Sequence, residues 1–395
     1  MRIRTFVASS ALAAAIAFAG AVRGEEGGGG FAKGPPDRPD FFPIAVWLQD
    51  VANAPKYRDV GVNVYVGLWR GPTAEQLDAL DAAGIRAIVR QSPASLKFRD
   101  RSTIIGWMHD DEPDNAQPLK RGQGEGYGPP VLPSAIVDGY REMKAADPDR
   151  PILLNLGQGV AWDGWYGRGV RTNHPEDYPE YLEGCDIASF DIYPVSHRDE
   201  AVAGKLWYVP RGVARLREWT GGRKPVWCCI ETTNIDHEDE TRRASPEQIR
   251  SEVWMALIRG AKGLIYFAHR FKPTFIEAGL LADDATARAV RDVNRRIHEL
   301  APVLHEPDVV DGVQAVLSNE KTPVATLVKR HEGFTYVFSA SLREGGTTVE
   351  FRLPEHADAT VEVLDESRTI EAPGGAWSDD FTGYQVHLYR IGPKK

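Results

Sequence analysis

Two glutamates stand where buried strands are expected to end. Glu112 follows an apolar run in the segment Gly106-Trp-Met-His-Asp-Asp-Glu-Pro-Asp114, and Glu231 directly follows the run Val226-Trp-Cys-Cys-Ile230. A pair of carboxyl groups can cleave an acetal bond, because one protonates the departing oxygen while the other attacks the carbon or activates water. The sequence therefore predicts acid–base and nucleophilic chemistry on Glu112 and Glu231.

The elements that would position these residues are eight short apolar runs that alternate with amphipathic helical stretches. This alternation indicates a parallel β/α architecture, and the near-continuous apolar character of the runs is typical of strands buried on both faces. Eight units over about 230 residues favour a closed (β/α)8 TIM barrel over an open sheet. The predicted strands span 44–48, 63–68, 87–90, 104–108, 152–156, 187–192, 226–230 and 263–268.

Helix signals lie between these strands. The stretch 72–84 ends on a capping Gly84, Ser245-Pro-Glu-Gln248 has the residues of a capping box, and 283–304 forms the eighth helix. The third crossover, 91–103, has weak helical character, so we expect a short or distorted helix there. Residues 115–133 predict an irregular, exposed loop after the fourth strand.

The pattern changes after residue 304. Short alternating strands at 335–340, 347–352 and 384–389 predict a small C-terminal antiparallel β-domain resembling a sandwich. Val349, Phe351 and Leu353 alternate along one strand and are expected in its core. The predicted organisation is thus a catalytic barrel at 41–304 and a β-sandwich-like domain at 305–395.

The N-terminus has the layout of a secretory signal peptide over 1–24: Met1-Arg-Ile-Arg4, an apolar run from Phe6 to Ala21, and small residues before a cleavage point. An uncleaved membrane anchor is the alternative. We expect a secreted or periplasmic protein without a membrane span in the mature chain, because no later segment approaches the ~20 apolar residues of a transmembrane helix. Residues 25–40 are a Gly/Pro-rich linker.

Composition narrows the partners. The formal net charge is −9 and positive charge is nowhere concentrated, so nucleic acid is not an expected partner. Cys185, Cys228 and Cys229 are too few for a disulfide framework and lack the paired spacing of a zinc site. We predict no cofactor and no catalytic metal, and the oligomeric state stays open. The acidic cluster 110–114 could instead bind a hard cation, although alternating side-chain directions oppose convergence of all its carboxylates.

Three segments resemble clan A of the retaining glycoside hydrolases: Asp111-Glu112-Pro113 after a strand, Asp191-Ile-Tyr-Pro194 two strands later, and Glu231 after Pro225-Val-Trp227. The resemblance covers about residues 41–304. It implies a retaining O-glycosyl hydrolase of an oligo- or polysaccharide, with Glu112 as general acid/base on the fourth strand and Glu231 as nucleophile on the seventh; together with the signal peptide, this predicts a secreted enzyme. Tyr193 corresponds to the sixth-strand tyrosine that approaches the nucleophile in many members.

One residue departs from that pattern. The clan usually has Asn immediately before the acid/base, where this chain has Asp111. An ionised Asp accepts a hydrogen bond from a sugar hydroxyl but cannot donate one. Its charge should raise the pKa of Glu112 and so favour the protonated acid near neutrality.

Residues at other strand ends could line a binding site. Aromatic faces stack on sugar rings, while Arg and His can hydrogen-bond hydroxyl groups; each residue could equally serve the core or a salt bridge. The candidates for substrate binding are Trp47, Trp69, Arg90, Asp111, Tyr193 and His269.

Two alternatives belong to other classes of protein. One is a non-catalytic carbohydrate-binding barrel, a pseudoenzyme that keeps the cleft without competent geometry. The other is a cell-surface interaction protein whose function lies in 305–395, which an exposed aromatic platform on that domain would favour.

Overall fold

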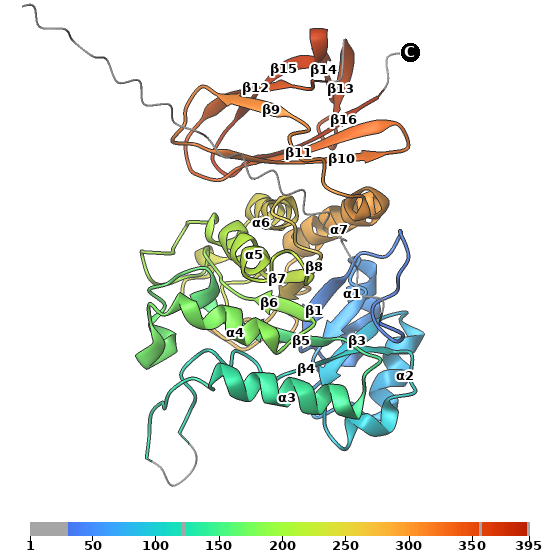
Figure 1. Cartoon of the computed structure of the whole chain (residues 1–395), viewed down its shortest axis with the longest axis vertical. Coiled ribbons are helices and arrows are strands. Elements are labelled where there is room, and N and C mark those ends of the chain that lie inside the picture. Colours follow the sequence, from blue (N-terminus) through green and yellow to red (C-terminus); the bar gives the residue numbers. More distant parts are fainter. Residues whose placement is uncertain (1–30, 120–123, 355–357, 393–395) are drawn as a thin grey trace, which may run out of the picture.

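A computed structural model describes residues 31–119, 124–354 and 358–392; the predicted signal peptide lies outside them. Eight parallel strands follow one another around a closed barrel in sequence order, with β8 pairing back onto β1. The (β/α)8 TIM barrel and the separate C-terminal antiparallel β-domain are both confirmed (Figure 1).

The barrel strands end within two residues of their predicted limits. Side chains such as Trp47, Ile88, Trp227 and Ile265 fill the barrel interior, while the alternate positions pack against the surrounding helices. The strands are β1 Ile44–Trp47, β2 Val64–Val66, β3 Arg86–Arg90, β4 Ile104–Met108, β5 Ile152–Leu156, β6 Ile187–Phe190, β7 Val226–Glu231 and β8 Gly263–Phe267.

The helices begin where the capping signals predict. The Ser245 hydroxyl accepts a hydrogen bond from the Gln248 backbone, and the Gln248 side chain accepts one from the Ser245 backbone. The third crossover holds a 3-10 helix, Ser95–Phe98, as its weak pattern predicts. The α-helices are α1 Ala54–Asp59, α2 Ala74–Ala82, α3 Pro133–Ala146, α4 Tyr178–Glu183, α5 Tyr208–Trp219, α6 Pro246–Ile258 and α7 Asp284–His305.

The C-terminal domain is a sandwich of two antiparallel sheets, β10-β11-β16-β13-β14 and β15-β12-β9. Val349, Phe351 and Leu353 are buried between the sheets, as their alternation predicts. The strands are β9 Gln314–Leu317, β10 Val324–His331, β11 Phe334–Ser341, β12 Thr347–Arg352, β13 Ala359–Val363, β14 Arg368–Ala372, β15 Ala376–Phe381 and β16 Val386–Ile391.

The sandwich packs on α6 and α7, outside the barrel wall (Figure 1). Trp254 of α6 packs against Phe338, with ring centroids 5.5 Å apart. The Ser251 hydroxyl donates to the Tyr384 carbonyl at 2.6 Å, and Arg250 donates to the Val386 carbonyl at 2.9 Å. Helix α6 therefore lies between the sandwich and the barrel strands.

The end of the predicted linker lies along the barrel. Residues 31–40 contain no helix or strand, yet the Lys33 backbone donates to the Asp149 carbonyl at 3.0 Å and the Lys144 ammonium lies 4.8 Å from the Phe31 ring centroid. The three cysteines are buried free thiols. In the described ranges, no helix has the length and apolar character needed to cross a membrane.

Candidate active site

Glu112 lies in an extension of β4 beyond the regular strand. The backbone N–H of His109 donates to the Leu153 carbonyl, and that of Glu112 donates to the Asn155 carbonyl, both at 3.1 Å. Glu112 adopts a positive φ of 43°, a left-handed conformation that costs energy for a residue other than glycine. The chain therefore turns sharply at this glutamate, held by β5.

The C-terminal ends of the barrel strands form the end of the barrel that is called the mouth below. A cavity of about 280 Å³ opens there beside Glu112. It combines carboxyl groups with aromatic faces, a combination suited to a polar ligand with apolar ring faces. Its lining residues are Trp47, Asp111, Glu112, Asn155, Gln158, Trp165, Asp191, Tyr193, Cys229 and Phe267.

The carboxyl group beside Glu112 in this pocket is that of Asp191, and each of the two groups affects the pKa of the other. Burial, followed by the negative charge of Asp111, raises the pKa of Glu112 to about 7. The effect of Asp111 is in the direction that the sequence predicts. Burial and the charge of Glu112 raise the pKa of Asp191 well above its usual value. The pair therefore retains a proton near neutrality.

Asn155 fixes the position of Asp111. Its amide donates to the Asp111 carboxylate at 2.9 Å, and its own oxygen accepts a hydrogen bond from the Ser189 hydroxyl at 2.8 Å. Asn155 thus connects the ends of β4, β5 and β6, and keeps a carboxylate next to the Glu112–Asp191 pair.

The acidic residues around Glu112 face different partners. Asp110 lies at the surface and pairs with Arg90 at 2.8 Å. Asp114 is buried and accepts hydrogen bonds from the Gly157 backbone at 2.8 Å and the Tyr178 hydroxyl at 2.9 Å. No cluster of three metal-type ligands occurs among the residues described. Arg90, a predicted binding residue, lies in this surface ion pair and does not line the pocket.

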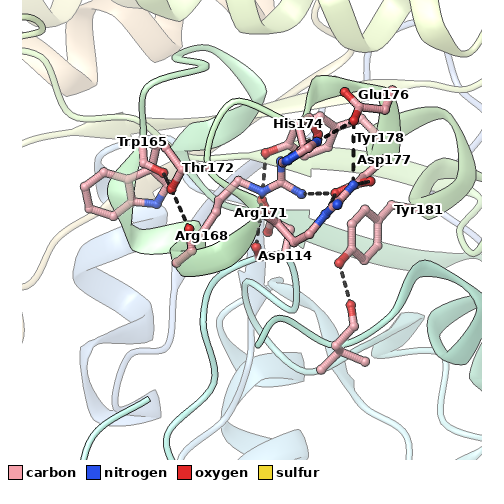
Figure 2. Close-up of polar contacts among 12 residues, drawn as sticks. Asp114, Trp165, Arg168, Arg171, Thr172, His174, Glu176, Asp177, Tyr178 and Tyr181 are labelled. Carbon is pink, nitrogen blue, oxygen red and sulfur yellow. Dashed lines mark hydrogen bonds and ion pairs between the residues drawn. The ribbon is translucent and has the colours of Figure 1, made fainter. Parts of the chain in front are cut away.

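The buried Arg168 stabilises the long segment of the chain that follows β5 (Figure 2). Arg168 donates to the carbonyls of Asp114 and His174 and to the carboxylate of Asp177, at 3.3, 2.8 and 2.7 Å. Its guanidinium lies 4.8 Å from the Tyr178 ring centroid. These contacts hold the segment that carries Trp165 over the pocket.

Glu231 lies at the end of β7 but outside the pocket lining. It is fully buried, and its two oxygens accept hydrogen bonds from the backbone N–H groups of Val195 and Ser196, at 2.6 and 2.8 Å. Burial raises the pKa of Glu231 to about 7, although these donors oppose the shift. The structure therefore does not bring Glu112 and Glu231 into one pocket.

The other predicted residues lie at or near the mouth. Trp47, Asp111 and Tyr193 line the pocket. Trp69 is exposed, and its indole N–H donates to Glu277 at 2.5 Å. His269 is buried behind the pocket wall, 3.3 Å from the Gln49 amide.

The pocket residues that sequence reasoning missed include Asp191, Trp165, Cys229 and Phe267. A signal existed for Asp191, because Ile187 faces the barrel interior and a period of two directs residue 191 the same way. No such sequence signal existed for Trp165, because it lies in a long crossover whose path depends on Arg168.

No protein-family model and no curated protein sequence matches the chain. Solved structures match its fold. An α-amylase from Geobacillus thermoleovorans, complexed with acarbose, has a TM-score of 0.55 at 11% identity, over 90% of this chain and 99% of its own. A putative α-galactosidase from Bacteroides fragilis has a TM-score of 0.52 at 12% identity, over 90% of this chain and 80% of its own. An Anoxybacillus α-amylase has a TM-score of 0.51 at 9% identity, over 91% of this chain and 100% of its own. At such identities the likeness establishes the fold of the barrel with its C-terminal domain.

Proposed function

We propose that the chain is a glycoside hydrolase that cleaves O-glycosidic bonds of an oligo- or polysaccharide at the barrel mouth. The observation that carries the proposal is the Glu112–Asp191 carboxyl pair in a pocket walled by Trp47 and Trp165. Glycoside hydrolysis requires a proton donor together with an ionised carboxylate, and aromatic faces stack on the C–H faces of sugar rings.

The similar solved structures support this class of reaction. They are α-amylases and a putative α-galactosidase, which are kinds of glycoside hydrolase. The one from Geobacillus thermoleovorans is complexed with acarbose, and two further similar structures hold maltotriose and maltose. Because one fold serves many functions, this likeness only adds to the argument from the site itself.

In the proposed reaction Glu112 transfers its proton to the glycosidic oxygen as the bond to the anomeric carbon breaks. Glu112 then removes a proton from water, whose oxygen bonds to the anomeric carbon and releases the sugar. The net reaction consumes one water for each bond cleaved and returns Glu112 to its acid form.

The identity of the second carboxylate separates two versions. In the retaining version that the sequence predicts, Glu231 attacks the anomeric carbon, which requires the backbone of Val195 and Ser196 to release its oxygens. In the other version Asp191, already in the pocket, provides this carboxylate. The side chains of Glu112 and Asp191 must then separate around the sugar, because retaining pairs stand about 5 to 5.5 Å apart.

The test is hydrolysis of aryl glycosides and soluble polysaccharides by the wild type and by Glu112→Gln, Asp191→Asn and Glu231→Gln, with product configuration followed by NMR. Glu112→Gln should lose activity in either version. If the product retains its anomeric configuration and Glu231→Gln loses activity, Glu231 is the nucleophile. If Asp191→Asn loses activity while Glu231→Gln stays active, Asp191 is the second carboxylate. A fully active Glu112→Gln variant would overturn the proposal.

The same test addresses the two alternatives. Sugar binding without hydrolysis by the wild type identifies a pseudoenzyme. An interaction protein centred on the C-terminal domain has less support. The large exposed hydrophobic side chains among its described residues are Val310 and Val316, whereas the large exposed aromatic side chains belong to the barrel. These positions favour a function at the barrel mouth.

We also propose that the chain is exported, on the basis of the signal peptide predicted at 1–24. Sequencing the N-terminus of protein recovered from outside the cytoplasm should give a chain that begins near residue 25. A full-length N-terminus in a membrane fraction would identify an uncleaved anchor instead.

A further inference from the structure

Exposed aromatic side chains continue from the pocket in one direction, on the loops after β8 and β2. The set called the aromatic patch below consists of Phe271, Phe275 and Trp69, whose side chains are 46%, 54% and 46% exposed. Large aromatic side chains usually lose most of their surface on folding, so three together at half exposure mark a binding surface.

Ring contacts join the patch to the pocket wall. Phe267 lines the pocket, and its ring centroid lies 5.1 Å from that of Tyr193 and 6.3 Å from that of Phe271. Phe271 in turn lies 5.8 Å from Phe275. Behind them the buried His269 ring is stacked on Phe271 at an interplanar angle of 8°. The patch is thus an outward continuation of the pocket lining.

A carboxylate fixes the base of the patch. Glu277 accepts hydrogen bonds from the Trp69 indole at 2.5 Å and from the Asp50 backbone at 2.8 Å, while the Gln49 amide donates to its carbonyl at 3.1 Å. The loops after β1, β2 and β8 are therefore tied together. A surface held in this way loses little conformational freedom when a ligand binds.

A second exposed ring lies across the mouth. Tyr166 is 63% exposed, and its ring centroid is 4.7 Å from that of Trp165, which lines the pocket. In a ring of eight strands β5 stands opposite β1, and the patch lies on the loops that flank β1. Exposed aromatic faces therefore stand on opposite sides of the carboxyl pair.

We infer that a polysaccharide chain lies across the mouth from Tyr166 to Phe275, with sugar rings stacked on both sides of Glu112, and that the enzyme cuts within the chain. The inference rests on the proposed function and adds the substrate class to it. An enzyme that released terminal units would need a binding surface on one side of the scissile bond only. Tyr166 on one flank of the mouth and the patch on the other provide a binding surface on each side of the scissile bond.

The first experiment follows wild-type digestion of soluble starch, xylan, galactan and carboxymethyl cellulose by viscosity and by reducing ends. Cleavage within chains should lower the viscosity before many reducing ends form. If reducing ends accumulate at nearly constant viscosity, the enzyme removes terminal units and the inference is overturned while the proposed function stands.

The second experiment measures binding of the same polymers to Glu112→Gln by affinity gel electrophoresis, with aromatic replacements added. Phe271→Leu/Phe275→Leu and Tyr166→Leu remove stacking faces but keep apolar volume, and each should weaken polymer binding about tenfold. Phe271→Tyr/Phe275→Tyr keeps the faces and should bind like its parent. Val316→Ala, an exposed apolar change on the sandwich, is the matched surface control.

The outcomes separate the two proposals. In the catalytically intact background, loss of the flanks should reduce kcat/KM more for polymer than for an aryl glycoside. Binding that depends on both flanks, without hydrolysis of any substrate, would overturn the proposed function but keep the polymer site. If aryl glycosides are hydrolysed but polymer binding is absent, or is unchanged in the variants of the two flanks, this inference alone is overturned.

Discussion

The carboxyl groups of Glu231 and Glu252 lie beside each other in a fully buried space between β7 and α6, and the charge of Glu231 contributes to the raised pKa of Glu252. Neither oxygen of Glu252 has a hydrogen-bond donor from the backbone or from a neutral or basic side chain among the described residues. Two ionised carboxylates cannot remain together without water or a cation, so one of them carries a proton. Glu231 also binds the backbone of Val195 and Ser196, so the pair anchors the loop that follows Asp191 and Tyr193.

The first prediction concerns stability and pH. Burial and the neighbouring Glu231 raise the pKa of Glu252 well above its ordinary 4.5, so the folded state binds more protons than the unfolded state above that pH. The free energy of unfolding should therefore fall as the pH rises from about 5 to 8. Glu252→Gln keeps a donor for Glu231 without titrating, and should flatten this dependence.

Urea denaturation of the wild type and Glu252→Gln at pH 5 and pH 8 measures the effect. Glu344→Gln, at an exposed position, is the control and should keep the wild-type slope. Equal slopes in the wild type and Glu252→Gln would show that the buried proton is absent.

The second prediction concerns Glu112. Removing a general acid/base costs about 100- to 10,000-fold in rate, so Glu112→Gln should lose activity to this extent on glycosides with poor leaving groups. Because a dinitrophenolate departs without protonation, the loss in the bond-cleavage step should be much smaller for a dinitrophenyl glycoside. Pre-steady-state release of dinitrophenol measures that step, and an equal loss on both substrates would exclude Glu112 as the proton donor.

The third prediction uses the charge of Asp111, which raises the pKa of Glu112. Asp111→Asn removes this charge but keeps an oxygen to accept the Asn155 hydrogen bond. The pKa of Glu112 should fall, and the alkaline limb of kcat/KM should move to lower pH because the acid loses its proton earlier. Asp110→Asn, at an exposed carboxylate paired with Arg90, is the neighbouring control and should leave that limb in place. An unmoved limb in Asp111→Asn would contradict the electrostatic role.

The fourth prediction concerns the buried Arg168 (Figure 2). Arg168→Met leaves the buried carboxylate of Asp114 without its neighbouring cation and removes one of the two arginines that pair with Asp177, which should lower the free energy of unfolding by about 3–5 kcal/mol. Substrate affinity should also fall, since Trp165 loses its support. Arg171→Lys, a change in a half-exposed side chain that also pairs with Asp177, should cost less than about 1 kcal/mol. Similar urea midpoints for the two variants would contradict this assignment.

The sequence by itself determined the barrel, because strands buried on both faces must be apolar throughout. The limits of β4 were predicted to the residue, and Ser245 and Gln248 marked the start of α6 before any tertiary contact was known. Those signals are local: each depends on burial or capping within a few neighbouring residues. The position of Glu112 at a strand end followed from the same local pattern.

Only the tertiary structure decided which carboxyl groups meet. Glu231 has the same strand parity as Trp227 and Cys229, which face the barrel interior, yet the loop at Val195 and Ser196 covers its carboxyl group. Asp191, for which sequence reasoning predicted no role, lies beside Glu112 instead. The direction of a side chain beyond the last strand pair depends on contacts between residues tens of positions apart, and no local pattern encodes them.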